Sequence, residues 1–480
     1  MTGMLKYKSV SKIDKKMHKT IQLLLLFITV ATLSSSAENK SQGDSIPGRW
    51  LYTGENFQPD PAEDKWWTLF GDSILNNLIA ESEANNSNII VAMHNIEIAR
   101  QNLNIARSQY FPQIGVSAAW NKTRSTGYAA SRTSTGPVYD SQFSGTVDMS
   151  WQIDLFGRIS AKAKQQKELL NASRAERDGM MVTVAAEIAS NYLQLRATQA
   201  KLTLAQEHIQ SQEHVLNIAK ARHEAGLASK LDVAQAQTIY NSTMATIPML
   251  EADSRAYIDA IALLTGVFPD QLFERLAKPR LMPSYNHIIC TGIPMELVRR
   301  RPDILQAEYQ LAASAAAVGI AKKDFLPTLT LEGSIGTAAH NAGDLFKNDS
   351  FTYSIAPTLS WTIFSGMSRS YSVRSAKAQM EADIENYNYA VQSAINEVDN
   401  AMSRYQGELR QIERLTLVVG SSRETFDLSL DLYKQGLSGF LNVANAQIDY
   451  LNYSTSLISA REEALLTMVS LYKALGGGWE

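Results

Sequence analysis

The apolar residues of positions 159–225 follow the seven-residue period of a coiled coil. This stretch contains no proline and one interior glycine, so it predicts a single uninterrupted helix. Such a helix would be roughly 100 Å long, several times the size of a compact core, and it therefore needs a continuous partner. The apolar positions that recur every seventh residue are Ile188, Leu195, Leu202, Ile209 and Leu216.

The same pattern occurs again 210 residues later, the distance from Gly226 to Gly436. The segment AGLASKLDVAQAQ at 225–237 aligns without a gap with QGLSGFLNVANAQ at 435–447, and in each a second helix returns after the turn. The turn, the apolar heptad positions and the glycine that ends each returning segment, Gly266 and Gly476, all share this offset. A chance similarity would not produce that agreement, so the sequence predicts two structural repeats. The second stripe consists of Val391, Val398, Tyr405, Ile412, Val419, Phe426 and Tyr433.

Two segments in each repeat alternate between apolar and small polar residues, which is the period of a strand. In the first repeat they are 113–120 and 143–153, separated by a polar loop at 121–142. In the second repeat they are 329–335 and 351–363. Each runs to about ten residues, the length that a tilted strand needs to cross a bilayer, and each would present one apolar and one polar face.

Taken alone, these four strands would also fit a soluble β-sandwich, but that fold does not accommodate helices of the predicted length. Four strands in a membrane cannot close a barrel, and an open edge leaves backbone groups unpaired in hydrocarbon. Other copies of the chain must then complete the barrel. Two copies would give eight strands and a filled interior, whereas three would give twelve strands and a possible lumen.

The N-terminal residues 1–37 are typical of a secretory signal peptide. Lysines precede an apolar run at 21–33, which is shorter than the roughly 20 residues of a membrane-spanning helix. Small residues precede a cleavage site after Ala37, and no cysteine lies near it to carry a lipid. The predicted organisation is a signal peptide (1–37), an extended segment (38–71), a first repeat (72–266), a linker (267–301) and a second repeat (302–480).

Composition gives little reason to expect chemistry. With 45 basic and 48 acidic residues the net charge is −3, which does not favour nucleic acid as a partner. The only cysteine is Cys290, which excludes an internal disulfide. His208, His214 and His223 are not spaced by four, as two metal ligands on one helical face would be, and no hydrolase or phosphate-binding motif is present. We expect no metal, no cofactor and no enzyme activity.

Two charged groups have more than one interpretation. Asp154 and Arg158 lie where the second strand leads into the long helix, and they could pair and cap that helix or serve a function; we favour capping. Arg299, Arg300 and Arg301 precede a proline, and we expect a solvated cluster, with a contact in the equatorial region at mid-height of the molecule as the alternative.

Several motifs resemble the TolC/OprM outer-membrane efflux factors of the NodT-type branch, and they cover nearly all of the mature chain in order. They are WQIDLFGR (151–158), IPMLEADSRAYIDAIALLTG (247–266), RRRPDILQAEYQL (299–311) and LYKALGGGW (471–479). The resemblance implies an α+β membrane protein: a homotrimer whose 12-stranded β-barrel lies in the outer membrane of a Gram-negative bacterium and continues into a periplasmic coiled-coil barrel. It also implies a passive exit duct for drugs or other small molecules, docked on a periplasmic adaptor and an inner-membrane pump of RND type.

The resemblance assigns roles to both hairpins. At the tips, the residues that would contact the adaptor are Gly226, Leu227, Gly436, Leu437 and Ser438. The residues that would form the periplasmic gate are Asp232, Tyr433, Leu441, Asn442 and Asn445. Members of the family commonly carry acidic residues at the last two positions, so the gate of this chain would lack their negative charge.

A secreted coiled-coil or adhesive protein without a pore is the alternative from another class. It would explain the heptads and the signal peptide, but not four amphipathic strands or the repeat. A pore former should fractionate with outer membranes and conduct ions in a planar bilayer, and a fibre should do neither.

Overall fold

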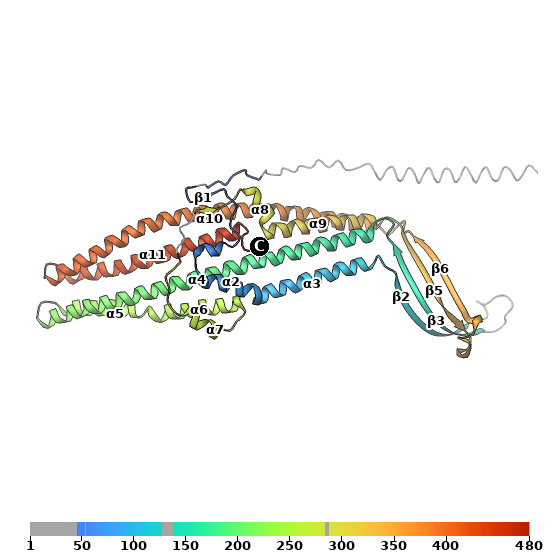
Figure 1. Ribbon diagram of the computed structural model, residues 1–480, viewed down its shortest axis with the longest axis horizontal. Coiled ribbons are helices and arrows are strands. Elements are labelled where there is room, and N and C mark those ends of the chain that lie inside the picture. Colours follow the sequence, from blue (N-terminus) through green and yellow to red (C-terminus); the bar gives the residue numbers. More distant parts are fainter. Residues whose placement is uncertain (1–45, 53, 127–137, 284–287, 480) are drawn as a thin grey trace, which may run out of the picture. The chain divides into compact units, whose positions relative to one another are not determined.

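The computed structural model describes residues 46–52, 54–126, 138–283 and 288–479 (Figure 1). The chain divides into the units Met1–Ile46 and Pro47–Glu480, and the description below concerns the second. The predicted signal peptide at 1–37 lies outside the described residues.

Two helices of 67 residues, α4 (Arg158–Glu224) and α10 (Ser368–Lys434), dominate the fold and confirm the predicted long helices. Gly226 and Gly436 lie in the left-handed region, with φ of 76° and 77°, and end them alike. In each turn the next backbone N–H reaches back to a carbonyl five residues earlier, at 2.8 Å in the first turn and 2.9 Å in the second.

The returning helices differ between the two hairpins. In the first, α5 (Lys230–Met244) and α6 (Ile247–Thr265) are separated by two residues, next to Pro248. In the second, α11 (Phe440–Ala474) runs unbroken over 35 residues. Proline has no N–H to donate to the carbonyl one turn back, which explains why only the first returning helix is interrupted.

Shorter elements complete the two halves. Asp72 caps α2 (Ser73–Asn85), since its carboxylate accepts hydrogen bonds from the backbone N–H groups of Ile74 and Leu75. The remaining elements are η1 (Trp66–Phe70), α3 (Ser87–Ser108), α7 (Pro269–Leu276), α8 (Pro294–Arg300), α9 (Pro302–Lys323), η2 (Ala342–Asp344), η3 (Asn348–Ser350) and a parallel pair of β1 (Phe57–Gln58) with β4 (Ile289–Cys290).

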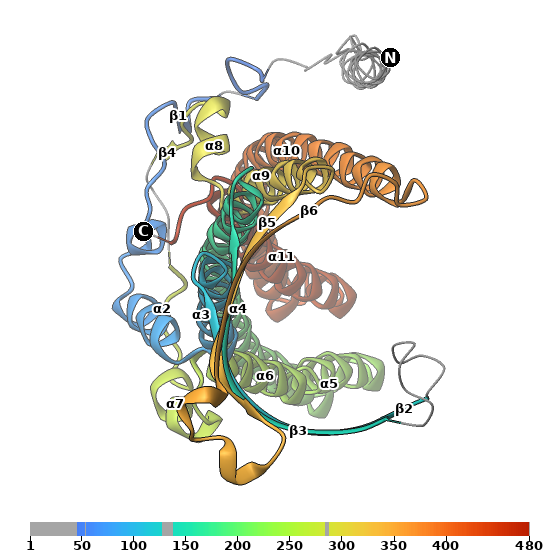
Figure 2. The ribbon, with the colours of Figure 1, turned by 90° about the vertical axis from the view of Figure 1, so that its right-hand side faces the viewer.

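A four-stranded antiparallel sheet lies in the order β2-β3-β5-β6. Its strands are β2 (Gln113–Ser125), β3 (Val138–Ile153), β5 (Thr328–Ala339) and β6 (Phe351–Ser360). In the end-on view the sheet is strongly curved, with α10 behind one end of the arc and α5 behind the other (Figure 2). The central β3–β5 pair joins the two sequence repeats.

Several strand boundaries predicted from the sequence are wrong, and β5 for one ends at Ala339 and not at 335. The expected polar loop at 121–142 is shorter, because residues 121–125 pair with 138–142. The last strand ends at Ser360 and not at 363. Backbone pairing does not require apolar side chains, so a polar stretch such as the one around Asn121 extends a strand without showing in the alternation.

Most buried residues belong to two apolar clusters. The larger one surrounds α4 near the middle of the chain's helical part, where Trp66 stacks on Tyr472 with ring centroids 5.5 Å apart. The smaller one lies near the two hairpin turns and includes Phe426, Tyr433 and Phe440. Within the described ranges, every helix is too short or too polar to be a membrane span.

Candidate functional site

The strand register places the apolar residues of all four strands on one face of the sheet. Ile114 of β2 pairs with Met149 of β3, and Val147 of β3 pairs with Ile335 of β5, which pairs with Tyr353 of β6. Ile114 and Tyr353 are 70% and 73% exposed. The sheet therefore presents a continuous, uncovered apolar surface of the kind that faces lipid.

The opposite face of the sheet is polar and internally hydrogen-bonded. The Ser117 hydroxyl contacts that of Thr146 at 2.7 Å and donates to Asp148 at 2.9 Å, while Ser334 and Ser354 contact each other at 2.9 Å. A sheet with one apolar face and one polar face is suited to form the wall of a water-filled pore in a membrane.

The junction between sheet and helices is fixed at equivalent points of both repeats. The indole N–H of Trp151 donates to the backbone oxygen of Tyr110, and that of Trp361 donates to the backbone oxygen of Phe325, each at 2.9 Å. Each bond ties the end of the second strand of a repeat to the residues just after the helix that precedes its first strand.

Asp154 caps α4, as the sequence predicted. Its carboxylate accepts hydrogen bonds from the backbone N–H groups of Ile159 and Ser160 at 2.9 Å and from the Ser160 hydroxyl at 2.6 Å. Arg158 does not pair with it. The Arg158 guanidinium instead donates to Asp324 at 2.5 Å, at the end of α9.

Near the hairpin turns, the structure brings together two of the predicted gate residues. Tyr433 on α10 is buried, and its hydroxyl lies 3.5 Å from the Asp232 carboxylate on α5. Burial and the nearby Asp232 charge raise the pKa of Tyr433. Phe440, at the start of α11, packs edge-on against the Tyr433 ring with centroids 5.3 Å apart.

A third residue belongs to this group and was missed from the sequence. Arg222, in the last turn of α4, lies over the Tyr433 ring with its guanidinium carbon 4.9 Å from the centroid. Its Nη1 donates to the backbone oxygen of Lys434 at 2.8 Å. The available signal was its place four residues before the turn glycine, where a basic side chain can reach a neighbouring helix end.

The other three predicted gate residues lie apart from this group, on the exposed face of α11. Leu441 is 58% exposed, and Asn442 and Asn445 are exposed as well. The Asn442 amide donates to the Ser438 hydroxyl at 2.9 Å. Their one-turn spacing puts Leu441 and Asn445 side by side on the helix.

The tips of both hairpins are open to their surroundings. Leu227 is 67% exposed and Leu437 is 72% exposed, and Gly226 and Gly436 beside them are exposed too. Each of the two matching turns thus exposes one leucine beside its glycine.

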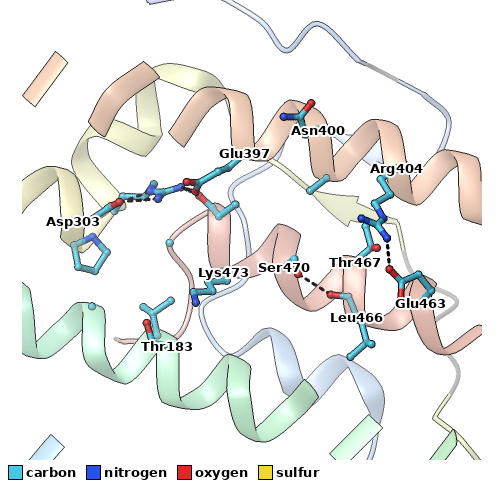
Figure 3. Close-up of a pocket in the computed structure, with 17 residues that line it drawn as sticks. Thr183, Asp303, Glu397, Asn400, Arg404, Glu463, Leu466, Thr467, Ser470 and Lys473 are labelled. Carbon is cyan, nitrogen blue, oxygen red and sulfur yellow. Dashed lines mark hydrogen bonds and ion pairs between the residues drawn. The ribbon is translucent and has the colours of Figure 1, made fainter. Parts of the chain in front are cut away.

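A cavity of about 670 Å³ lies where α4, α9, α10 and α11 meet (Figure 3). On its wall, Arg301 donates to Asp303 at 2.7 Å, to Glu397 at 2.7 Å and to the backbone oxygen of Ala474 at 2.9 Å. Arg300 forms an ion pair with Asp64. The expected solvated arginine cluster is therefore wrong for these two residues, since Arg301 ties the linker to the helices and Arg300 ties it to the segment before η1.

The three histidines lie in different environments along α4. His208 is buried with its ring 4.9 Å from that of Tyr450, and burial lowers its pKa. His214 is exposed, and His223 is exposed with a ring nitrogen 2.9 Å from the oxygen of Ala228. Among the residues that the structure describes, no three His, Cys, Asp or Glu side chains form a possible metal site.

An amphipathic sheet, joined to long helices that turn back at two matching hairpins, defines a class of protein: outer-membrane channels with a helical periplasmic body. A family model described as outer membrane efflux protein matches residues 78–267 and 293–477. The chain therefore belongs to the outer membrane efflux protein family, which confirms the resemblance seen in the sequence.

Known proteins are similar over most of the chain. The pyoverdine export outer membrane protein OpmQ of Pseudomonas aeruginosa is 29% identical, covering 96% of this chain and 97% of its own. Nodulation protein T of Rhizobium leguminosarum bv. trifolii is 29% identical, covering 90% and 92%. The solved structure of the outer-membrane channel OprN is 28% identical, with a TM-score of 0.85, covering 90% of this chain and 97% of its own.

These findings place the chain in the outer membrane, extending into the periplasm, as an efflux channel. They confirm the predicted location and function. The alternative of a secreted coiled-coil protein without a pore is not supported.

Proposed function

We propose that three copies of this chain assemble into the exit duct of a tripartite efflux system. The observation that carries the trimer is the sheet, in which β2 and β6 each have one strand neighbour among the described residues. An edge left unpaired in hydrocarbon is costly, so strands of other copies complete the ladder. Three copies give twelve strands and leave a lumen, whereas the eight strands of two copies would be filled by side chains.

The helices support the same assembly. Large apolar side chains on α10 remain uncovered in one chain, including Leu417 at 61% and Leu428 at 58% exposed. On the opposite hairpin, Met249 and Leu263 are 64% and 79% exposed. Neighbouring copies would bury these surfaces against each other and close the helical wall around the duct.

The duct would receive its cargo from a periplasmic adaptor and an inner-membrane pump of RND type. The tips at Gly226, Leu227, Gly436, Leu437 and Ser438 suit adaptor contact because they lie at the ends of both hairpins, where all of these residues except the half-buried Ser438 are exposed. The relative named for pyoverdine export indicates that the cargo is a small molecule, and passive transit requires no bond-making and no cofactor. We also propose that the chain consists of two repeats, 72–266 and 302–480, joined by the linker 267–301.

The gate would combine the group around Asp232 and Tyr433 with rings made by Leu441, Asn442 and Asn445. Three-fold symmetry turns each position into a ring of three side chains. Asparagines add no charge, so closure depends on the apolar Leu441 ring and amide hydrogen bonds more than on an acidic ring.

Mass measurement and conductance test the proposal. The detergent-solubilised protein should have the mass of three chains, and Asp232→Ala should raise its conductance in a planar bilayer. Asp431→Ala is the matched control, because Asp431 is an exposed carboxylate on α10, two residues before Tyr433. A monomer that stays soluble without detergent and conducts nothing would refute the proposal.

The amide rings have their own test. Asn442→Asp with Asn445→Asp should introduce block of the conductance by multivalent cations, which the wild-type channel should lack. Strong block of the wild type that disappears in Asp232→Asn would instead place the charge in the first hairpin.

A further inference from the structure

Within one chain, the end of α10 is held against the first hairpin by two polar contacts of unequal strength. The Tyr433 hydroxyl lies 3.5 Å from Asp232, which is the outer limit of a hydrogen bond. The Arg222 bond to the backbone oxygen of Lys434 is 2.8 Å long and has a charged donor. Each contact includes one charged group, the Asp232 carboxylate or the Arg222 guanidinium, so the difference in length decides, and the 2.8 Å bond of Arg222 is the stronger of the two.

The acceptor of Arg222 suits a cation. Lys434 is the last residue of α10, and its carbonyl is one of those that a helix leaves without an internal partner. The C-terminus of a helix carries partial negative charge, which attracts a guanidinium. Arg222 thus donates a hydrogen bond to the otherwise unpaired carbonyl of Lys434 and places a positive charge at the negative end of the α10 dipole.

The Arg222 side chain also has a defined position. It is half-buried, and its guanidinium carbon lies 4.9 Å from the centroid of the Tyr433 ring, which supplies a cation–π contact. A Cβ placed on Gly436 would lie 3.5 Å from its Nη2, so the guanidinium reaches the turn that follows α10. Its position therefore depends on the place of α10, and it cannot keep these contacts if the second hairpin moves away from α4.

We propose that Arg222 is the positioning residue that holds the second hairpin against the first in the closed channel, and that opening requires its release from Lys434 and Tyr433. The inference rests on the proposed function, since it names the residue that controls the same gate. According to this proposal, the contacts of Arg222 stabilise the closed channel more than the Tyr433–Asp232 contact does.

Single-channel conductance of the full-length protein tests this assignment. Arg222→Ala should raise the ratio of open to closed channels about ten- to hundredfold, as expected for loss of a charged hydrogen bond. Arg222→Lys should lie between Ala and wild type, because an ammonium can reach the carbonyl but cannot stack as a planar group. Lys220→Ala is the matched control, since Lys220 is an exposed basic residue on the same helix end.

The outcomes separate the inference from the proposed function. If Asp232→Ala opens the channel while Arg222→Ala behaves like Lys220→Ala, Arg222 is not the residue that holds the gate closed. The proposed function as an exit duct would be unaffected by that result. If no variant and no wild-type channel conducts, the proposed function itself is overturned. Should Arg222→Ala fail to accumulate, Arg222→Gln and Arg222→Lys decide: opening in the order Gln, Lys, wild type supports the assignment, and equal opening overturns it.

Discussion

Replacement of Arg301 by alanine should destabilise the helical body more than replacement of either neighbouring arginine. Arg301 is 8% exposed and donates to Asp303, Glu397 and the backbone oxygen of Ala474. Burial by itself lowers the pKa of the guanidinium, but the two carboxylates raise it overall, so the group is charged. It joins the start of α9 to α10 and to the end of α11.

The magnitude follows from what each partner can do once the arginine is gone. The side chains of Asp303 and Glu397 are 51% and 49% exposed, so they return to water, and each lost ion pair costs at most about 1 kcal/mol. The buried bond to the Ala474 carbonyl leaves an unsatisfied acceptor, which costs about 1–3 kcal/mol. The loss should therefore total about 2–4 kcal/mol, including the packing of the arginine stem.

Thermal unfolding of the purified protein, followed by circular dichroism, measures this effect. Arg299→Ala is the control, because Arg299 is exposed and precedes Arg301 by two residues. The midpoint should fall clearly in Arg301→Ala and remain unchanged in Arg299→Ala. Equal midpoints for the two variants would show that the buried arginine contributes no more than a solvated one, and the reasoning would be wrong.

Three further changes have defined expectations, each read from the same unfolding measurement. Asp154→Ala should cost about 1–2 kcal/mol because α4 loses its N-terminal cap, whereas Phe364→Ala, at the equivalent position of the second repeat, should leave its helix start unaffected. Burial lowers the pKa of His208 below 6.5, so the unfolded chain takes up a proton first. Stability should then be fully present above pH 6.5 and fall as the pH drops, and His208→Leu, but not a change at exposed His223, should reduce that dependence. Gly266→Ala should cost roughly 2–4 kcal/mol, because φ is 70° there and the new Cβ would lie 2.4 Å from the backbone oxygen of Asn85. An unchanged midpoint in Asp154→Ala or Gly266→Ala, or an unchanged pH dependence in His208→Leu, would contradict the cause stated for that variant.

The sequence determined the large elements of this protein because their signals are local and periodic. Heptads and the absence of proline defined two long helices, and a shared offset defined the matching turns at Gly226 and Gly436. Alternation defined four strands, and even the cap at Asp154 could be read from its place before the helix. The family resemblance then indicated an efflux channel, which the family model confirmed.

Only the tertiary structure decided which side chains meet across the chain. Arg222 contacts the end of a helix that begins 146 residues after it (368 minus 222), and Arg301 is buried by α10 and α11 rather than solvated. Polar residues around Asn121 extend a strand because a partner strand pairs with their backbone. Periodicity records which face of an element is buried, whereas a long polar side chain takes its partner from whichever element folding brings within reach. That partner is not encoded in the local pattern.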